Sequence, residues 1–325
     1  MNKVKEDSFK LSHTSKKNRA YNLDTLEITS DYFKTKSHES LYRSTIQKHK
    51  TLSKLIQLID VASPDRKKQY WKTYHCKNVL LQNGNKLSGS LCRKRWCATC
   101  SRIKTAELTN AYKAPILDLG QLYFITLTRP NVSSRQLKNE VKKLIKAFQK
   151  IKDNLRKNYG IKLNGMRKIE ITYNKVSNTY HPHFHFIQQG YKEAQLLQSL
   201  WLKQFPSASN KAQNIKHVHS GNDSALIELF KYATKQITKD ATDAHAEDTI
   251  YRALDGVRIY QTYGKLKKVR IPKEKPNELT NADFLPPQNE IWVYEDSVKD
   301  YVNGTNQVLI DTILIEQRIK TALLI

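Results

Sequence analysis

Residues 121–237 carry a regular succession of strand and helix patterns. The run "LYFITLT" (122–128) is rich in β-branched and aromatic residues and is ended by Arg129-Pro130, which is typical of a buried strand. The segment after it has a serine cap at Ser133 or Ser134 and should end between Asn158 and Gly160. Its apolar residues recur every three or four positions and predict one long amphipathic helix: Leu137, Val141, Leu144, Phe148, Ile151 and Leu155.

The next two patterns predict a β-hairpin. "MRKIEITYN" (166–174) and "YHPHFHFIQQ" (180–189) read as strands joined by the turn "NKVSNT" (174–179). If Tyr173 pairs with Tyr180 across this turn, the constant index sum of an antiparallel ladder places Glu170 opposite His183.

Three more elements complete the predicted core. A helix is expected over 191–205, a strand over 214–220, and a final helix over 225–237 after a cap at Asn222, Asp223 or Ser224. The order β-α-β-β-α-β is the ferredoxin-like arrangement, so the expected fold class is α+β with an antiparallel sheet. Unrelated activities share this arrangement, so it does not indicate a function by itself.

The flanking regions have weaker patterns. Helices are expected over 40–59 and 102–114, the first forty residues are expected to be flexible, 273–290 reads as a loop, and a helix closes 307–325. The expected division is a basic, partly flexible amino-terminal region (1–65), a cysteine-rich element with a helix (66–112), the ferredoxin-like core (113–245) and a carboxy-terminal extension for DNA binding or interaction (246–325).

The chain is strongly basic. Its 56 Lys and Arg residues exceed its 30 Asp and Glu residues, which gives a formal charge of +26 and a pI near 9.8. Such an imbalance favours a polyanionic partner such as nucleic acid over an ordinary solvated basic surface. No apolar run approaches the roughly 20 residues of a membrane helix, and the first residues lack the apolar core of a signal peptide, so a cytoplasmic location is expected.

All four cysteines fall in one region and suggest a metal site. Cys76 is followed by Cys92, Cys97 and Cys100 in "LCRKRWCATC". Clustered thiols in a reducing compartment hold a structural zinc more often than a disulfide, although His75 could replace Cys76, and reduced buried cysteines or a redox pair are the alternatives. The neighbouring cations Arg93, Lys94, Arg95 and Arg102 would then face a phosphate backbone.

A ladder of histidines provides the second candidate site. Alternate residues of a strand share a face, so His181, His183 and His185 lie together, and the predicted register adds Glu170. Two neutral imidazoles and a carboxylate can bind a divalent ion such as Mn²⁺ or Mg²⁺ that polarises a phosphodiester. The alternative is a polar sheet face with hydrogen-bonded histidines. A second pair, His217 and His219, could be metal ligands, phosphate contacts or solvated side chains.

The final helix contains a candidate nucleophile. Glu228, Lys231, Tyr232 and Lys235 are spaced i, i+3, i+4 and i+7 and share one helix face. The phenol could attack phosphorus, the ammonium groups would favour the phenolate and the developing negative charge, and the carboxylate could activate water. An ordinary surface helix is the alternative.

Taken together, "FITLT", "HPHFHF" and "ELFKYATK" resemble, in order and spacing, the three motifs of the HUH endonucleases, specifically the single-tyrosine initiators of plasmid rolling-circle replication. The stretches "CRKRWCATC" and "ALDGVRIYQTYGKLKK" also resemble parts of those initiators, so the resemblance covers roughly residues 76–268.

The resemblance implies a role for each matching residue. His183 and His185 would bind the divalent metal, with Glu170 as the candidate third ligand. Tyr232 would nick one strand, remain linked to its 5′ end and leave a free 3′ hydroxyl, while Lys235 completes the Tyr-x-x-Lys motif and Glu228 would help hydrolysis end the cycle. His181 is additional to the minimal motif.

The resemblance also implies the partners. The DNA would be a plasmid origin, with a hairpin and a single-stranded nick site, contacted by basic residues that include Arg93, Lys94, Arg95 and Lys231. No Walker-type glycine-rich loop is present, so strand separation would fall to a host helicase. The alternatives are a relaxase or single-tyrosine transposase of the same superfamily, or a non-catalytic nucleic-acid-binding regulator.

Overall fold

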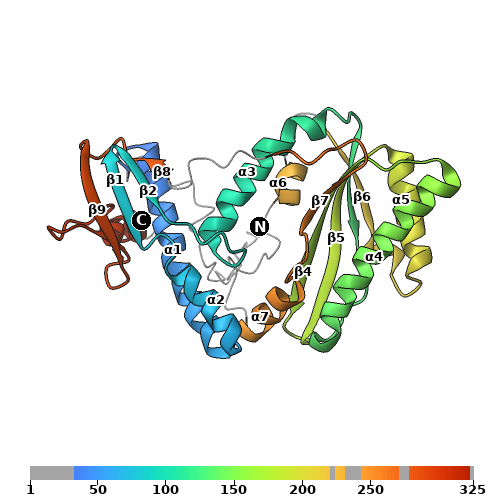
Figure 1. Ribbon diagram of the computed structural model, residues 1–325, viewed down its shortest axis with the longest axis horizontal. Helices are drawn as coiled ribbons and strands as arrows, with labels where there is room; N and C mark the ends of the chain where they lie inside the picture. The colour runs from blue at the N-terminus through green and yellow to red at the C-terminus, as the bar shows by residue number, and fades with distance from the viewer. Residues whose placement is uncertain (1–32, 220–223, 231–242, 271–277, 323–325) are drawn as a thin grey trace, which may run out of the picture.

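A computed structural model describes residues 33–219, 224–230, 243–270 and 278–322. Within these residues the chain forms two antiparallel five-stranded sheets together with helices, which confirms the α+β class. The sheets lie at opposite ends of the molecule, and helices α3 (Ala98–Leu117) and α6 (Ser224–Phe230) lie between them (Figure 1).

The predicted core elements form the second sheet. In chain order they are β3 (Leu122–Leu127), α4 (Ser134–Tyr159), β4 (Gly165–Asn174), β5 (Thr179–Gln189), α5 (Tyr191–Gln204) and β6 (Asn214–Val218). A short 3₁₀ turn, η2 (Asn210–Ala212), precedes β6, and β7 (Tyr260–Tyr263) adds an edge strand, which gives the strand order β6-β3-β5-β4-β7. Tyr173 pairs with Tyr180 and Glu170 with His183, so the predicted hairpin register is confirmed.

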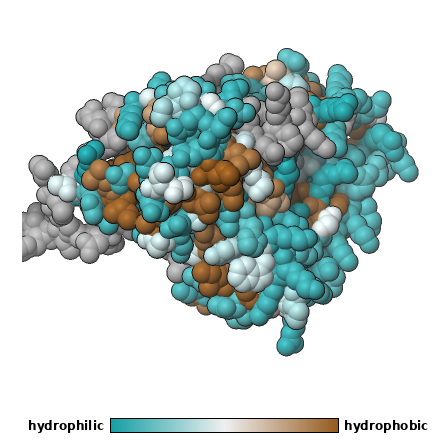
Figure 2. Space-filling model, turned by 60° about the vertical axis from the view of Figure 1, so that its left-hand side comes forward, coloured by the Kyte–Doolittle hydropathy of each residue, from teal (hydrophilic) through white to brown (hydrophobic). Residues whose placement is uncertain are grey.

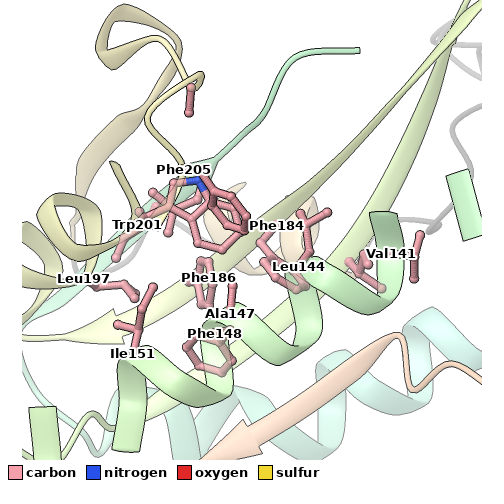
Figure 3. Close-up of a cluster of buried hydrophobic side chains, with 14 of the residues drawn as sticks. Val141, Leu144, Ala147, Phe148, Ile151, Phe184, Phe186, Leu197, Trp201 and Phe205 are labelled. Carbon is pink, nitrogen blue, oxygen red and sulfur yellow. The ribbon is translucent and has the colours of Figure 1, made fainter. Parts of the chain in front are cut away.

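Helices α4 and α5 bury one face of this sheet. A capping box between Ser133 and Gln136 starts α4, and Gly160 ends it with a φ of 66°, a conformation that glycine adopts without strain. The apolar side chains of α4 pack against Phe184 and Phe186 of β5 (Figure 3). Trp201 of α5 closes the cluster, and its indole N–H donates to the carbonyl oxygen of Thr128 at 3.0 Å.

Helices α3 and α6 cover the opposite face of the same sheet. Met166 and Ile187 form a second apolar cluster there with Leu108 of α3 and Phe230 of α6. The helix expected over 102–114 is therefore present and longer than expected. The helix expected over 225–237 is present as α6 up to Phe230, and residues 231–237 lie outside the described residues. Because this face is also covered, strand β5 is buried along most of its length.

The first sheet joins segments from both ends of the chain. Its strand order is β10 (Asp300–Val302), β9 (Gln288–Glu295), β1 (Val79–Gly84), β2 (Lys86–Gly89) and β8 (Glu278–Asn281). Helices α1 (Lys36–Val61), α2 (Pro64–Tyr74) and α8 (Thr312–Ala322) accompany it. The expectation of a loop over 273–290 is wrong where β8 and the start of β9 fall, because these strands pair with β2 and β1 about 200 residues earlier.

Strands also pair across the boundary that the sequence analysis placed at residue 245. β7 lies beyond residue 245 but pairs with β4, and the hairpin β1–β2 shares a sheet with strands of the carboxy-terminal region. On the outer face of that sheet the cross-strand pairs Val79–Val293 and Leu81–Ile291 are exposed. Figure 2 shows hydrophobic residues gathered on this side of the molecule.

Helix α7 (Ala244–Ala253) connects the two sheets. Its Tyr251 ring lies 5.6 Å from the ring of Trp96, and its Asp248 accepts a 2.7 Å hydrogen bond from Tyr70 of α2. Lys54 of α1 pairs with the buried Glu247 at 3.0 Å. Among the described helices, none has the length and apolar composition needed to cross a membrane.

Candidate metal centres and active site

Glu170, His183 and His185 meet on the face of the sheet that α3 and α6 cover. Glu170 is fully buried, and the two histidines are 6% and 7% exposed. The Nε2 atoms of the histidines are 3.2 Å apart, and Nε2 of His185 lies 3.5 Å from Oε2 of Glu170. Ligand atoms about 2.1 Å from one ion lie roughly 3.0–3.4 Å from one another at octahedral or tetrahedral angles. These two distances are close to that range, and the ligand atoms of all three side chains lie within 4.8 Å of one another, so the group could hold one divalent ion.

Hydrogen bonds orient both imidazoles toward this position. Nδ1 of His183 lies 3.0 Å from the carbonyl oxygen of His181, which can only accept, so Nε2 keeps its lone pair. Nδ1 of His185 lies 3.1 Å from Oγ1 of Thr126. Burial lowers the pKa of His183 to about 4, against the opposing effect of Glu170, so its ring is neutral at pH 7. A neutral imidazole is the form that binds a metal.

Lys168 belongs to this site, and the sequence analysis missed it. Its ammonium group is fully buried, lies 2.7 Å from Oε2 of Glu170 and donates to the carbonyl oxygen of Glu228 at 3.3 Å. The sequence pattern that could have identified Lys168 is "KIE" (168–170). Residues two apart in a strand share a face, so Lys168 and Glu170 lie on one face of β4. Lys168 thereby connects the candidate metal ligands to helix α6.

The last described residue of helix α6, Phe230, is bonded to residues around the same group. The carbonyl oxygen of Phe230 accepts hydrogen bonds from Thr105 of α3 at 2.9 Å and from Tyr260 of β7 at 3.1 Å. Tyr260 stands opposite Lys168 in the ladder, and burial, together with the charge of Glu170, raises its pKa. Glu228 is half-buried in α6. Lys231, Tyr232 and Lys235 lie outside the described residues.

The other histidines occupy different positions. His181 stacks on His183 with ring centroids 5.0 Å apart, but its side chain is not part of the close ligand group. His217 pairs with Tyr123, whose ring belongs to the cluster beneath α4 and α5, so it lies on the opposite face of the sheet. His217 and His219 are both exposed. The structure thus separates the two His-x-His pairs.

The four cysteines converge at the start of α3. Sγ of Cys76 lies 3.6 Å from that of Cys100 and 3.8 Å from that of Cys97, and the Cys92–Cys100 distance is 3.7 Å. Zinc–sulfur bonds of about 2.3 Å in a tetrahedron give sulfur–sulfur distances of about 3.8 Å. His75 is exposed and lies 3.4 Å from the side-chain amide of Asn78, so Cys76 and not His75 belongs to the group of four side chains that could hold a metal ion.

Two buried lysines lie beside the cysteines. Lys48 donates to the carbonyl oxygen of Cys76 at 2.7 Å, and Lys77 donates to Ser44 at 2.8 Å. Burial lowers the pKa of each lysine to about 8, and the nearby thiolates act in the opposite direction. Four thiolates around one divalent ion carry a net charge of −2, which these ammonium groups would offset.

The cations of the cysteine loop differ in what they contact. Arg93 is exposed, with a positive φ of 53°. The ammonium group of Lys94 lies 5.6 Å from the ring centre of Trp96. Arg95 donates to the carbonyl oxygen of Leu254 at 2.7 Å, so this residue holds the segment after α7.

Comparisons with known proteins identify the family of the chain. A family profile described as "Replication protein" matches residues 85–303. A "Protein rep" of Staphylococcus aureus is 30% identical over 160 residues, which cover 44% of this chain and 69% of that protein. A "Protein rep" of Streptococcus pneumoniae serotype 2 is 24% identical over 261 residues, covering 75% and 77%. No solved structure matches. The chain belongs to the replication protein family and is a plasmid rolling-circle replication initiator.

Proposed function

We propose that the protein binds the double-strand origin of its plasmid and nicks one strand by metal-dependent transesterification. The observation that carries this proposal is the buried group of Glu170, His183 and His185, which Lys168 connects to helix α6. The strand order β6-β3-β5-β4, with α4 and α5 on one face of the sheet, agrees with the ferredoxin-like order proposed for an HUH endonuclease core and supports the same proposal.

The donor set suits an oxygen- and nitrogen-binding divalent ion. Two neutral imidazoles and one carboxylate leave coordination positions for substrate oxygens. A Mn²⁺ or Mg²⁺ ion held by Glu170, His183 and His185 would polarise the scissile phosphodiester. Lys168 would keep the Glu170 carboxylate aimed at the histidines, because the two groups are in contact and both are fully buried.

Tyr232 is the proposed nucleophile. Its phenol oxygen would attack the scissile phosphorus, forming a bond to the 5′ end of the cut strand. The bond to the 3′ oxygen would break, and that oxygen would take up a proton and become the primer hydroxyl. One phosphoester replaces another, so no ATP is needed.

The charged residues near Tyr232 complete the proposed chemistry. Lys231 and Lys235 would favour the phenolate and the negative charge that develops on phosphorus. Glu228 would activate water to hydrolyse the phosphotyrosine bond when replication ends. Helix α6, which contains Glu228, is connected to the sheet by a hydrogen bond from Lys168 to the carbonyl oxygen of Glu228.

Origin recognition is assigned to the basic surface. Arg93 and Lys94 stand beside the cysteine cluster, and we propose salt-dependent phosphate contacts there, while Arg95 is also engaged with the chain itself. The proposed DNA is a hairpin with a single-stranded nick site, and a host helicase would separate the strands.

Replacing His183 tests the proposed metal site. His183→Ala should lower nicking of a single-stranded origin oligonucleotide in Mn²⁺ by at least roughly 100-fold, because the ion provides several kcal/mol of transition-state stabilisation. The matched control is His217→Ala, which removes an exposed imidazole from the other face of the sheet and should nick like wild type. If both variants lose nicking activity equally, or if neither loses it, the assignment of His183 as a metal ligand is contradicted.

Removing Lys168 gives a readout that needs no DNA. Lys168→Met should lower the free energy of unfolding in metal-free buffer by roughly 3–5 kcal/mol, because a buried carboxylate loses its ammonium partner. Mn²⁺ should raise the melting temperature of this variant more than that of wild type. The control Lys168→Met/Glu170→Gln should recover stability and lose the Mn²⁺ response. If Mn²⁺ raises the melting temperature of wild type, the single variant and the double variant equally, a metal ion at Glu170 is contradicted.

We also propose a structural zinc ion at Cys76, Cys92, Cys97 and Cys100. Elemental analysis should find about one zinc per chain. Cys97→Ser should lose the metal. Folding or DNA binding should then weaken, because the cysteine ligands would no longer be held together at the start of α3. His75→Ala should keep its zinc, since His75 is exposed and outside the sulfur cluster. Wild-type protein free of zinc after purification without chelator would refute the site.

A further inference from the structure

A small polar cavity lies between helices α1 and α3, and none of the residues assigned to nicking or to metal binding lines it. We call it the α1–α3 cavity, and it encloses about 220 Å³. Its polar lining from the two helices is Ser40, Ser44 and Gln47 of α1 and Thr99 and Arg102 of α3. Within each helix these positions are three or four residues apart, so they share one face. Lys77, which precedes β1, completes the polar lining.

Lys77 brings a buried charge to this cavity. The residue is 3% exposed, and within the described part of the chain its ammonium group has one hydrogen-bond partner, the hydroxyl of Ser44 at 2.8 Å. An ammonium group has three N–H donors, and a buried charge is costly when its donors lack acceptors. The backbone of Lys77 is fixed on both sides, because its N–H donates to Ser90 and its carbonyl oxygen accepts from Tyr301. The cavity therefore contains preorganised donors for an anionic ligand.

The charges around the cavity also favour an anion. Arg102 is exposed, and among the described residues it makes neither an ion pair nor a hydrogen bond through its side chain. No Asp or Glu of the described chain lines the cavity. The proposed zinc ion with four thiolates would carry a charge of −2, which Lys48 and Lys77 offset. Arg102 then leaves an excess of positive charge at the cavity.

The size and lining of the cavity favour a terminal phosphate group over a DNA strand. Its volume is below the roughly 300–1,000 Å³ of pockets that hold drug-sized ligands. None of the described lining residues is aromatic, so a base has no ring on which to stack. A terminal phosphate has three acceptor oxygens and a charge of about −1.5 to −2, whereas a phosphodiester has fewer free oxygens and about one negative charge. Donors from Lys77, Thr99 and Arg102 suit the terminal group.

We propose that the α1–α3 cavity binds a small anion with a terminal phosphate group, either inorganic phosphate or a phosphorylated small molecule. The site is separate from the proposed nicking site and does not depend on it. A ligand held there would connect α1, which accompanies the first sheet, with α3, which covers a face of the second sheet.

The test is isothermal titration calorimetry of the whole protein with inorganic phosphate and, separately, with adenosine 5′-monophosphate. A salt concentration of roughly 150 mM screens charges that are more than about 8 Å apart and exposed. Arg102→Gln should weaken binding of phosphate by roughly tenfold or more, because the ligand loses charge-assisted hydrogen bonds. Thr99→Val, which keeps both cations and removes one hydroxyl, should weaken it by roughly fivefold.

The matched control is Arg156→Gln, which makes the same change at an exposed residue of α4, on the opposite side of the second sheet. This variant should bind phosphate like wild type. Without phosphate, the melting temperature and zinc content of Arg102→Gln should equal those of wild type, because Arg102 is exposed and makes no contact that holds the fold.

The two probes identify the source of the phosphate group. Tighter binding of adenosine 5′-monophosphate would support a phosphorylated small molecule, and equal or tighter binding of inorganic phosphate would support the free ion. The inference is overturned if Arg102→Gln and Arg156→Gln bind phosphate alike. It is also overturned if dimethyl phosphate, a diester, binds wild type as tightly as inorganic phosphate, because the cavity would then be a contact for a DNA backbone. The assay contains no DNA, so its result is independent of whether the protein nicks.

Discussion

The buried ion pair between Lys168 and Glu170 determines how the candidate active site is held together. Both side chains are fully buried on the sheet face beneath α6, where a lone charge would be strongly destabilising. The carboxylate is pinned beside the two histidines, and the ammonium group also reaches the carbonyl oxygen of Glu228. The ion pair therefore connects the candidate metal ligands on β4 and β5 to helix α6.

The cysteine cluster is connected to the candidate active site by helix α3. Cys97 precedes this helix and Cys100 lies in its first turn, so a metal held by the four sulfurs would set where the helix begins. From α3, the hydroxyl of Thr105 donates a 2.9 Å hydrogen bond to the carbonyl oxygen of Phe230, the last described residue of α6. The two candidate metal sites are thus linked by one helix.

Local patterns made the core of the structure predictable from the sequence. The alternation in "HPHFHF" and the short turn before it determine the hairpin register, and through it the pairing of Glu170 with His183. The first sheet was not predictable in this way, because β1 pairs with β9 about 200 residues away. Lys168 was missed because a lysine in a basic chain suggests solvent, and only its buried position shows its contact with Glu170.

We propose that Tyr232 becomes covalently joined to DNA. The most direct measurement mixes the protein with Mn²⁺ and a labelled single-stranded oligonucleotide from its plasmid's origin, and separates the products on a denaturing protein gel. Wild type should give a labelled adduct, and Tyr232→Phe should give none while binding the oligonucleotide equally well. An adduct with Tyr232→Phe would contradict the assigned nucleophile. Equal binding without an adduct in either protein, over several origin strands and metals, would favour a non-catalytic DNA-binding protein.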